Sequence, residues 1–144
     1  MISDNEIKNL KKKSAELRLD ILNMIFDAKK GHIGGAYSCL DLLTTLYYTN
    51  LLNISPKNLN FTDRDIFILS KGHSAVAQYT ILADQDFFDK KFLKSFNHEG
   101  SFLGEHPDRG TPGIEADSGS LGHGLAIAAG IALASKINNI DNHI

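Results

Sequence analysis

At 144 residues the chain has the length of one domain, and a hydrophobic content of 42% is enough for a single buried core. A formal net charge of -2 excludes a global electrostatic attraction to nucleic acid or anionic lipid, so we expect neither as a partner. Cys39 is the only cysteine, which excludes an internal disulfide and fits a reducing compartment. Because the sequence shows no signal peptide and no apolar run of roughly 18 residues, we expect a cytoplasmic protein.

Two helices are predicted near the start of the chain. Ser3 and Glu6 form a capping-box pattern, and apolar or small residues then recur at steps of three and four. The recurring positions are Ile7, Leu10, Ser14, Leu17, Ile21 and Met24. Gly31 is predicted to stop this helix. Ser38 and Asp41 give the start signal of a second helix. Its inward-facing residues are predicted to be Leu42, Leu43, Leu46, Tyr47 and Leu51.

The segment Asp65–Leu69 is the one predicted strand. It is a short apolar run with β-branched and aromatic residues and no polar alternation, as expected for a strand covered on both faces. The polar turn Ser70–His73 follows it, and a helix is predicted from Ser74 to about Ala83. Strand, turn and helix in this order favour a ligand-binding loop at the carboxyl end of the strand.

The second half of the chain contains two further predicted helices and a long loop. Aromatic residues between Phe87 and Phe96 predict a short amphipathic helix. From His98 to Ser118 there is no periodicity, and a loop of that length in a compact domain is usually functional or disordered. The small-residue run Leu125–Ala134 predicts an apolar helix, and the free backbone N–H groups at its start would favour an anion such as a phosphate.

These elements do not complete a sheet. A single buried strand cannot form one, because its backbone groups need strand partners on both sides. The polar segment Asn138–Ile144 does not supply the next strand. We therefore expect an α/β fold that is helix-rich and whose parallel sheet is incomplete, so that residues 1–144 form a single partial domain. A complementary polypeptide or a truncated sequence would explain the deficit, and the exposed strand edge would favour an oligomer.

Histidines are the main candidates for chemistry. Those at junctions between predicted elements are His32, His73, His98, His106 and His123. Histidine donates or accepts a proton near neutral pH, so several of them in one cavity would suit hydroxyl and carbonyl substrates. Neighbouring glycines favour a functional role for all of these except His98. We interpret His98 and His143 as structural or solvated.

Other types of site fit the sequence less well. Three histidines with a carboxylate such as Glu105 could bind zinc, but no His-Glu-x-x-His or paired-cysteine spacing is present. The stretch Gly113–Gly130 lacks the Gly-Lys-Ser/Thr of a P-loop and the spacing of the dinucleotide fingerprint. Close packing of a small-residue helix would explain its alanines, but not Gly119, Gly122 and Gly124.

Four separated segments, in order, resemble the amino-terminal part of the transketolase family, whose enzymes use thiamine diphosphate. These four motif segments are Lys30–Gly35, Asp63–His73, Gly104–Pro107 and Pro112–Gly124. The ordered set covers nearly the whole chain and is far more specific than any one segment. It is most similar to the amino-terminal subunit of split transketolases.

The resemblance implies a thiamine-diphosphate-binding fold and a role for each site residue. His32 would face the sugar substrate, and His106 would lie near the reacting carbons. His73 would contact the diphosphate, which moves the phosphate away from the start of the Leu125–Ala134 helix. The other cofactor contacts would be made by Gly119, Ser120, Leu121 and His123. The family reaction transfers a two-carbon ketol unit from a ketose phosphate to an aldose, with the cofactor as electron sink.

The sequence departs from the family pattern in three ways. Ile33-Gly34 replaces the usual Pro-Gly, and His123 replaces the usual glutamine. The Gly-Asp-Gly motif and asparagine that hold Mg²⁺, and the glutamate that activates the aminopyrimidine, do not occur in these residues, so no metal ligand is assigned to this chain. One interpretation is an enzyme that is active only with a complementary polypeptide and inactive as the isolated chain. The alternative is a non-catalytic truncated remnant or interaction module.

Overall fold

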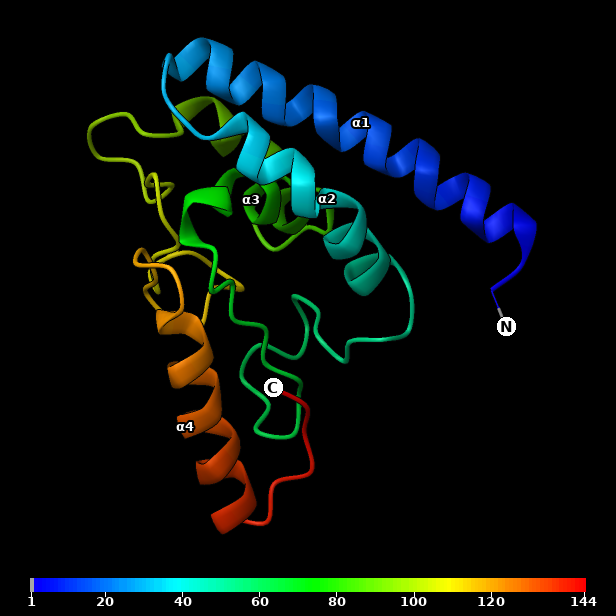
Figure 1. Cartoon of the computed structure of the whole chain (residues 1–144), viewed down its shortest axis with the longest axis vertical. Helices are drawn as coiled ribbons and strands as arrows, with labels where there is room; N and C mark the ends of the chain where they lie inside the picture. Colours follow the sequence, from blue (N-terminus) through cyan, green and yellow to red (C-terminus); the bar gives the residue numbers. More distant parts are fainter. Residues whose placement is uncertain (1) are drawn as a thin grey trace.

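The computed structural model describes residues 2–144, which form helices joined by irregular segments (Figure 1). The helices are α1 (Asp4–Ala28), α2 (Ile33–Tyr48), α3 (Ala75–Asp84) and α4 (His123–Ile137), with the 3-10 helices η1 (Gly72–Ser74) and η2 (Lys90–Ser95). Residues 2–144 contain no strand. Within the same residues, no helix is both long and apolar enough to cross a membrane.

Helix α1 begins as the sequence predicts, but Ile7, the first residue of the predicted buried stripe, is 41% exposed. Ser3 Oγ accepts from the backbone N of Glu6 at 3.3 Å, and the backbone N of Ser3 donates to Glu6 Oε2 at 2.8 Å, so the capping box is confirmed. The buried stripe consists of Ser14, Leu17, Ile21 and Met24. The helix ends at Ala28 because Lys29 takes a left-handed conformation with φ 53°, so Gly31 lies in the following turn and does not stop the helix.

Helix α2 begins at Ile33, so the predicted start at Ser38 and Asp41 is wrong. Leu42 and Leu51, which were predicted to face inward, are 65% and 59% exposed. The polar residues that suggested a cap make other bonds inside the folded chain. Ser38 Oγ donates to the backbone O of Gly35 at 2.8 Å. The Asp41 carboxylate accepts from Ser14 and, at 3.0 Å, from Arg18, both on α1. Both residues therefore stabilise an existing helix rather than begin one.

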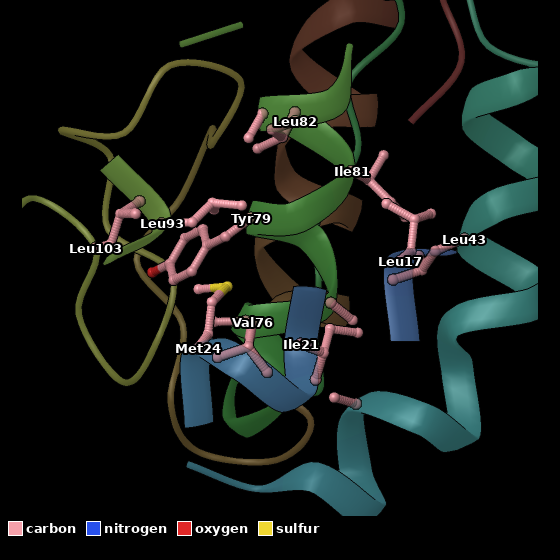
Figure 2. Close-up of a cluster of buried hydrophobic side chains, with 14 of the residues drawn as sticks. Leu17, Ile21, Met24, Leu43, Val76, Tyr79, Ile81, Leu82, Leu93 and Leu103 are labelled. Carbon is pink, nitrogen blue, oxygen red and sulfur yellow. The ribbon is translucent and has the colours of Figure 1, made fainter. Parts of the chain in front are cut away.

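Helix α3 is the centre of the core, as Figure 2 shows. The predicted helix is confirmed, since α3 spans Ala75–Asp84, and every residue from Ala75 to Ala83 is buried. The side chains around α3 include Leu17, Ile21 and Met24 of α1, Leu43 of α2, and Leu93 and Leu103 of later segments. Burying one such side chain stabilises the fold by about 1.5–3 kcal/mol. This packing fixes the starts of α2 and α3 relative to each other, and the candidate site forms there.

An ion-paired group, the Asp84 cluster, joins α1, α2 and α3 at the edge of this core. The Asp84 carboxylate accepts from Lys13 Nζ at 2.8 Å and from the Tyr48 hydroxyl, and Lys90 Nζ lies 3.9 Å away. The Asp84 side chain is only 19% exposed. Burial alone would raise the pKa of Asp84, but the bonds from Lys13 and Tyr48 outweigh burial and lower it.

The predicted strand Asp65–Leu69 does not form in this chain. The backbone N of Asp65 donates to Asn53 O at 3.1 Å, and that of Ile66 donates to His143 O at 2.9 Å. A ladder needs repeated backbone bonds to an extended neighbouring segment. The segment that contains His143 accepts one such bond, so no ladder forms. As expected, Asn138–Ile144 is not a strand. The His143 side chain is 91% exposed, in agreement with a solvated residue.

The remaining predictions hold with changed boundaries. The helix predicted between Phe87 and Phe96 is the short 3-10 helix η2, and Asp89 caps it by accepting from the backbone N of Lys91 at 2.9 Å. Residues 98–118 are irregular, as predicted. Helix α4 extends beyond the predicted run at both ends and points away from α1, α2 and α3 in Figure 1. Its buried residues are Gly124 and Ser135.

Candidate functional site

Two close backbone approaches connect the first, second and fourth motif segments. A Cβ at Gly35 would lie 2.8 Å from Cδ2 of His73 and 3.0 Å from Oγ of Ser74, so the first turn of α2 touches η1. A Cβ at Gly72 would lie 2.8 Å from the backbone O of Ser118. Both distances are too short for any residue with a side chain unless its neighbours move. The glycines therefore allow segments distant in sequence to meet.

The fourth motif segment also contacts the second and third. Ser118 Oγ donates to the backbone O of Leu69 at 2.8 Å. A Cβ at Gly124 would lie 2.5 Å from the Cα of Ser70, so the start of α4 rests on the second segment. A Cβ at Gly119 would lie 3.7 Å from Cδ2 of His106 in the third segment. All four motif segments therefore meet in one place.

His32 and His73 form the centre of the site. Their ring centroids are 5.5 Å apart with an edge-to-face angle of 68°. His32 precedes α2 and its side chain is 50% exposed, with Nδ1 3.9 Å from Oε1 of Glu105. Burial lowers the pKa of His73, and positive charge on His32, Lys71 and His106 lowers it further. His73 is therefore a neutral imidazole at neutral pH, able to accept a proton or donate an N–H.

His106 is exposed, but the core holds its backbone. The Tyr79 hydroxyl donates to the backbone O of His106 at 2.7 Å. Tyr79 lies on α3 and is fully buried, and this burial raises the pKa of its hydroxyl. The hydroxyl therefore stays protonated and remains a donor at physiological pH. In this way α3 positions the loop that presents His106 to Gly119.

The other site residues lie at the exposed start of α4. Ser120, Leu121 and His123 are exposed, with Leu121 70% exposed. The structure thus brings His32, His73, His106 and Gly119 together and leaves these three side chains in solvent beside them. His98, which we interpreted as structural or solvated, is exposed.

Backbone N–H groups at the start of α4 already have acceptors. The backbone N of His123 donates to Ser120 O at 3.2 Å, and that of Leu125 donates to Ser70 Oγ at 3.3 Å. These bonds compete with an anion at this helix terminus.

Lys71 is a site residue that the sequence analysis did not single out. Its Nζ donates to the backbone O of Gly35 at 2.9 Å and to Ser38 Oγ at 2.5 Å. A lysine between an apolar run and a Gly-His pair was the available signal. Glu105 was considered only as a zinc ligand, whereas in the structure it faces His32.

The donor set fits an anionic cofactor better than a metal ion. Among residues 2–144, no three His, Cys, Asp or Glu side chains are grouped so as to hold a metal. A neutral His73 offers an N–H donor, and Lys71 beside it contributes a positive charge. These groups suit the oxygens of a diphosphate.

Comparison with known proteins identifies the family. The family model described as "Transketolase, thiamine diphosphate binding domain" matches residues 10–143. The chain belongs to the transketolase family. The resemblance found in its four motif segments is therefore confirmed, and the matched part of this transketolase-family chain is the part that binds thiamine diphosphate in the family.

Similar curated proteins come from split transketolases. An apulose-4-phosphate transketolase subunit from Phocaeicola vulgatus is 37% identical over 136 residues, which cover 94% of this chain and 48% of that protein. The protein of the same name from Actinobacillus succinogenes is 40% identical over 129 residues, covering 88% and 46%. The chain therefore spans about half the length of the curated relatives it matches.

Solved transketolases share the fold of this chain. The transketolase from Leishmania mexicana is 30% identical with a TM-score of 0.79, over 88% of this chain and 19% of that one. The transketolase from Campylobacter jejuni is 33% identical with a TM-score of 0.79, over 88% and 20%. The helical arrangement described above is therefore that of transketolases, whose fold is of the α/β class.

Proposed function

We propose that the chain is part of a thiamine-diphosphate-dependent enzyme that transfers a two-carbon ketol unit between sugar phosphates. The observation that carries this proposal is the convergence of the four motif segments, with the His32 and His73 rings 5.5 Å apart and His106 beside Gly119. Two relatives are named as apulose-4-phosphate transketolase subunits, which supports sugar phosphates as the substrate class. Residues 1–144 are then the amino-terminal portion of the diphosphate-binding domain, with a parallel sheet that other residues complete.

The residues of this chain bind groups and move protons in the proposed reaction. When bound, thiamine diphosphate supplies an electron sink for cleavage of a carbon–carbon bond. His32 and His106 hold substrate hydroxyl groups and take up or return their protons at the imidazole nitrogens. His73, kept neutral by its surroundings, donates an N–H to a diphosphate oxygen. The remaining cofactor contacts are made by the backbone of Gly119, Ser120 and Leu121, together with His123.

A complementary polypeptide supplies the Mg²⁺ ligands and the activating glutamate in this proposal. The chain spans 48% of a relative that is itself named as one subunit. The start and exposed face of α4 carry the apolar residues Leu121, Leu125, Leu133 and Ile137, which are 70%, 73%, 59% and 70% exposed. Exposed apolar groups of this kind mark surfaces that pack against other protein. The isolated chain is accordingly inactive, and activity belongs to the oligomer.

The alternative is a non-catalytic truncated remnant or interaction module. It is favoured by one observation: in the part of the chain that the structure describes, no metal-binding group forms. Two phosphates without a divalent cation lack their main counter-charge. A remnant of this kind retains the helical core and the α4 surface without binding the cofactor. Detecting tight, Mg²⁺-dependent binding of thiamine diphosphate to the isolated chain by calorimetry rules this alternative out.

The proposed enzyme is tested by reconstitution. The chain is mixed with a separately produced polypeptide that carries the Gly-Asp-Gly motif and the activating glutamate, together with thiamine diphosphate and Mg²⁺, and ketol transfer is measured. We expect transfer only in the complete mixture. His32→Ala and His106→Ala lower kcat/KM by about 10²–10⁴-fold, as for loss of a general acid or base. His98→Ala, an exposed histidine outside the motif segments, is the matched control and retains the activity. Absence of transfer in every mixture contradicts the proposal.

A further inference from the structure

Lys71 connects the segment that carries His73 to the helix that follows His32. Its Nζ donates to the backbone O of Gly35 at 2.9 Å and to Ser38 Oγ at 2.5 Å. Ser38 Oγ itself donates to the same carbonyl at 2.8 Å, so one ammonium, one hydroxyl and one carbonyl form a closed triangle. A charged donor makes stronger hydrogen bonds than a neutral one. The triangle therefore links the second motif segment firmly to the first turn of α2.

This link lies beside the close approach of Gly35 to the His73 ring. A Cβ at Gly35 would lie 2.8 Å from Cδ2 and 3.1 Å from Nε2 of His73. The carbonyl that Lys71 binds and the Cα that faces the His73 ring thus belong to the same residue. A shift of Gly35 away from Lys71 would change the distance between Gly35 and the His73 ring. Because His32 directly precedes α2, it would also change the 5.5 Å separation of the His32 and His73 rings.

The charges that face His73 come from three segments of the chain. His32 precedes α2, His106 lies on the irregular loop, and Lys71 lies on the segment of His73 itself. The carboxylate of Glu105 lies next to His32, with Oε1 3.9 Å from His32 Nδ1. The positive charge of Lys71 lowers the pKa of His73. It therefore disfavours the protonated form of His73 as well as anchoring its segment.

We propose that Lys71 is a positioning residue that fixes His73 against His32 through Gly35 and Ser38. It acts through His73 and does not itself touch the substrate. The catalytic consequence rests on the proposed transketolase function, whereas the positioning itself does not. The two parts are therefore tested by separate measurements.

The first measurement is an NMR titration of the histidine rings in the 144-residue chain, with nuclear Overhauser effects between His32 and His73. Lys71→Met removes both the bonds and the charge, so we expect the His73 midpoint to rise and the His32–His73 effects to weaken. Lys71→Arg keeps the charge and retains a low midpoint. Ser38→Ala removes one acceptor but no charge, so it weakens the ring contacts and moves the midpoint less than Lys71→Met does. Lys57→Met, an exposed lysine in the α2–α3 connection, is the control and changes neither.

The second measurement is steady-state kinetics of the reconstituted mixture. Lys71→Met lowers kcat by about tenfold to a hundredfold, the range expected when a catalytic group moves by roughly 1 Å, and Lys71→Arg restores part of the rate. An unchanged His73 midpoint and unchanged ring contacts in Lys71→Met overturn the inference, as does an equal change in Lys57→Met. If the unsubstituted mixture shows no ketol transfer, the proposed function fails, but the NMR result still decides the role of Lys71.

Discussion

Gly34 and Gly35 are adjacent glycines in the first turn of α2, and alanine at each position tests how tightly the histidine site is packed. A Cβ at Gly34 meets no atom within 4 Å, whereas a Cβ at Gly35 would lie 2.8 Å from Cδ2 of His73 and 3.0 Å from Oγ of Ser74. Alanine stabilises a helical position by about 0.5–1 kcal/mol relative to glycine, and both variants share this gain. Overpacking costs about 1–3 kcal/mol and applies to Gly35→Ala alone. We therefore expect Gly34→Ala to be the more stable variant by about 1–3 kcal/mol.

Urea and thermal denaturation of the two variants, followed by circular dichroism, measure this difference. For a chain of this size, 1 kcal/mol moves the Tm by about 4 °C, so the two variants are readily separated. The His73 ring can also yield, by about 0.6 Å if it retreats from 2.8 Å to an ordinary contact of 3.4 Å. In that case the stability difference shrinks, but the Overhauser effects between His32 and His73 change. Equal stabilisation by both alanines with unchanged ring contacts would refute the packing described here.

Three further predictions concern other parts of the chain. Tyr79→Phe removes the hydroxyl that donates to the backbone O of His106, and we expect a loss of about 1 kcal/mol of unfolding free energy in urea; an unchanged midpoint would show that the bond contributes nothing. The pKa of Asp84 is lowered in the fold, so its stabilisation is complete above the ordinary value of 3.8 and is lost as the pH falls through the lower folded value. Asp84→Asn should therefore flatten the acid limb of Tm against pH, and an acid limb as steep as that of the unsubstituted chain would point to other carboxylates. Leu125→Ser and Leu133→Ser change exposed side chains, so the isolated chain should lose no more than about 0.5 kcal/mol, while sedimentation should show weaker association with the complementary polypeptide. Unchanged association would exclude α4 from that interface.

The sequence predicts best those elements whose signals are local. The capping box at Ser3 and Glu6 and the buried stripe of α1 lie within one helix, so periodicity alone is sufficient. Helix α3 is found for a similar reason, since it is a short run of apolar and small residues beginning directly after a polar turn. Both predictions depend only on contacts that any fold burying these residues would make.

The predicted start of α2 was wrong because a tertiary contact determined it. Gly34 and Gly35 have low helix propensity, so the predicted helix began after them. In the structure Gly35 lies in the first turn of α2, and the ring of His73 occupies the space where a side chain would lie. Asp41, interpreted as a cap, accepts from Arg18 on α1. Both contacts join residues far apart in the sequence, so local periodicity does not reveal them. The bonds of Lys71 could not be predicted for the same reason.

The strand prediction for Asp65–Leu69 was not met for a different reason. Its composition suits a strand covered on both faces, yet in this chain its backbone meets Asn53 and His143 rather than a ladder. A strand is a property of neighbouring segments, whereas a helix satisfies its own backbone. The apolar residues of α4 are exposed for a related reason, since no other helix of the described chain packs on them. The composition of a segment thus indicates whether it could be a strand, but the strand forms only where neighbouring segments pair with it.

The site residues fall into two groups that differ in what holds them. His32, His73 and His106 are fixed by the core, through the contact of α2 with η1 and the bond from Tyr79. Ser120, Leu121 and His123 lie at the start of α4, on the apolar surface that the proposed complementary polypeptide covers. A cofactor that contacts both groups therefore binds better where α4 is held in place. Because such coupling is reciprocal, thiamine diphosphate should tighten the association of the two polypeptides by the same factor by which association tightens the binding of the cofactor.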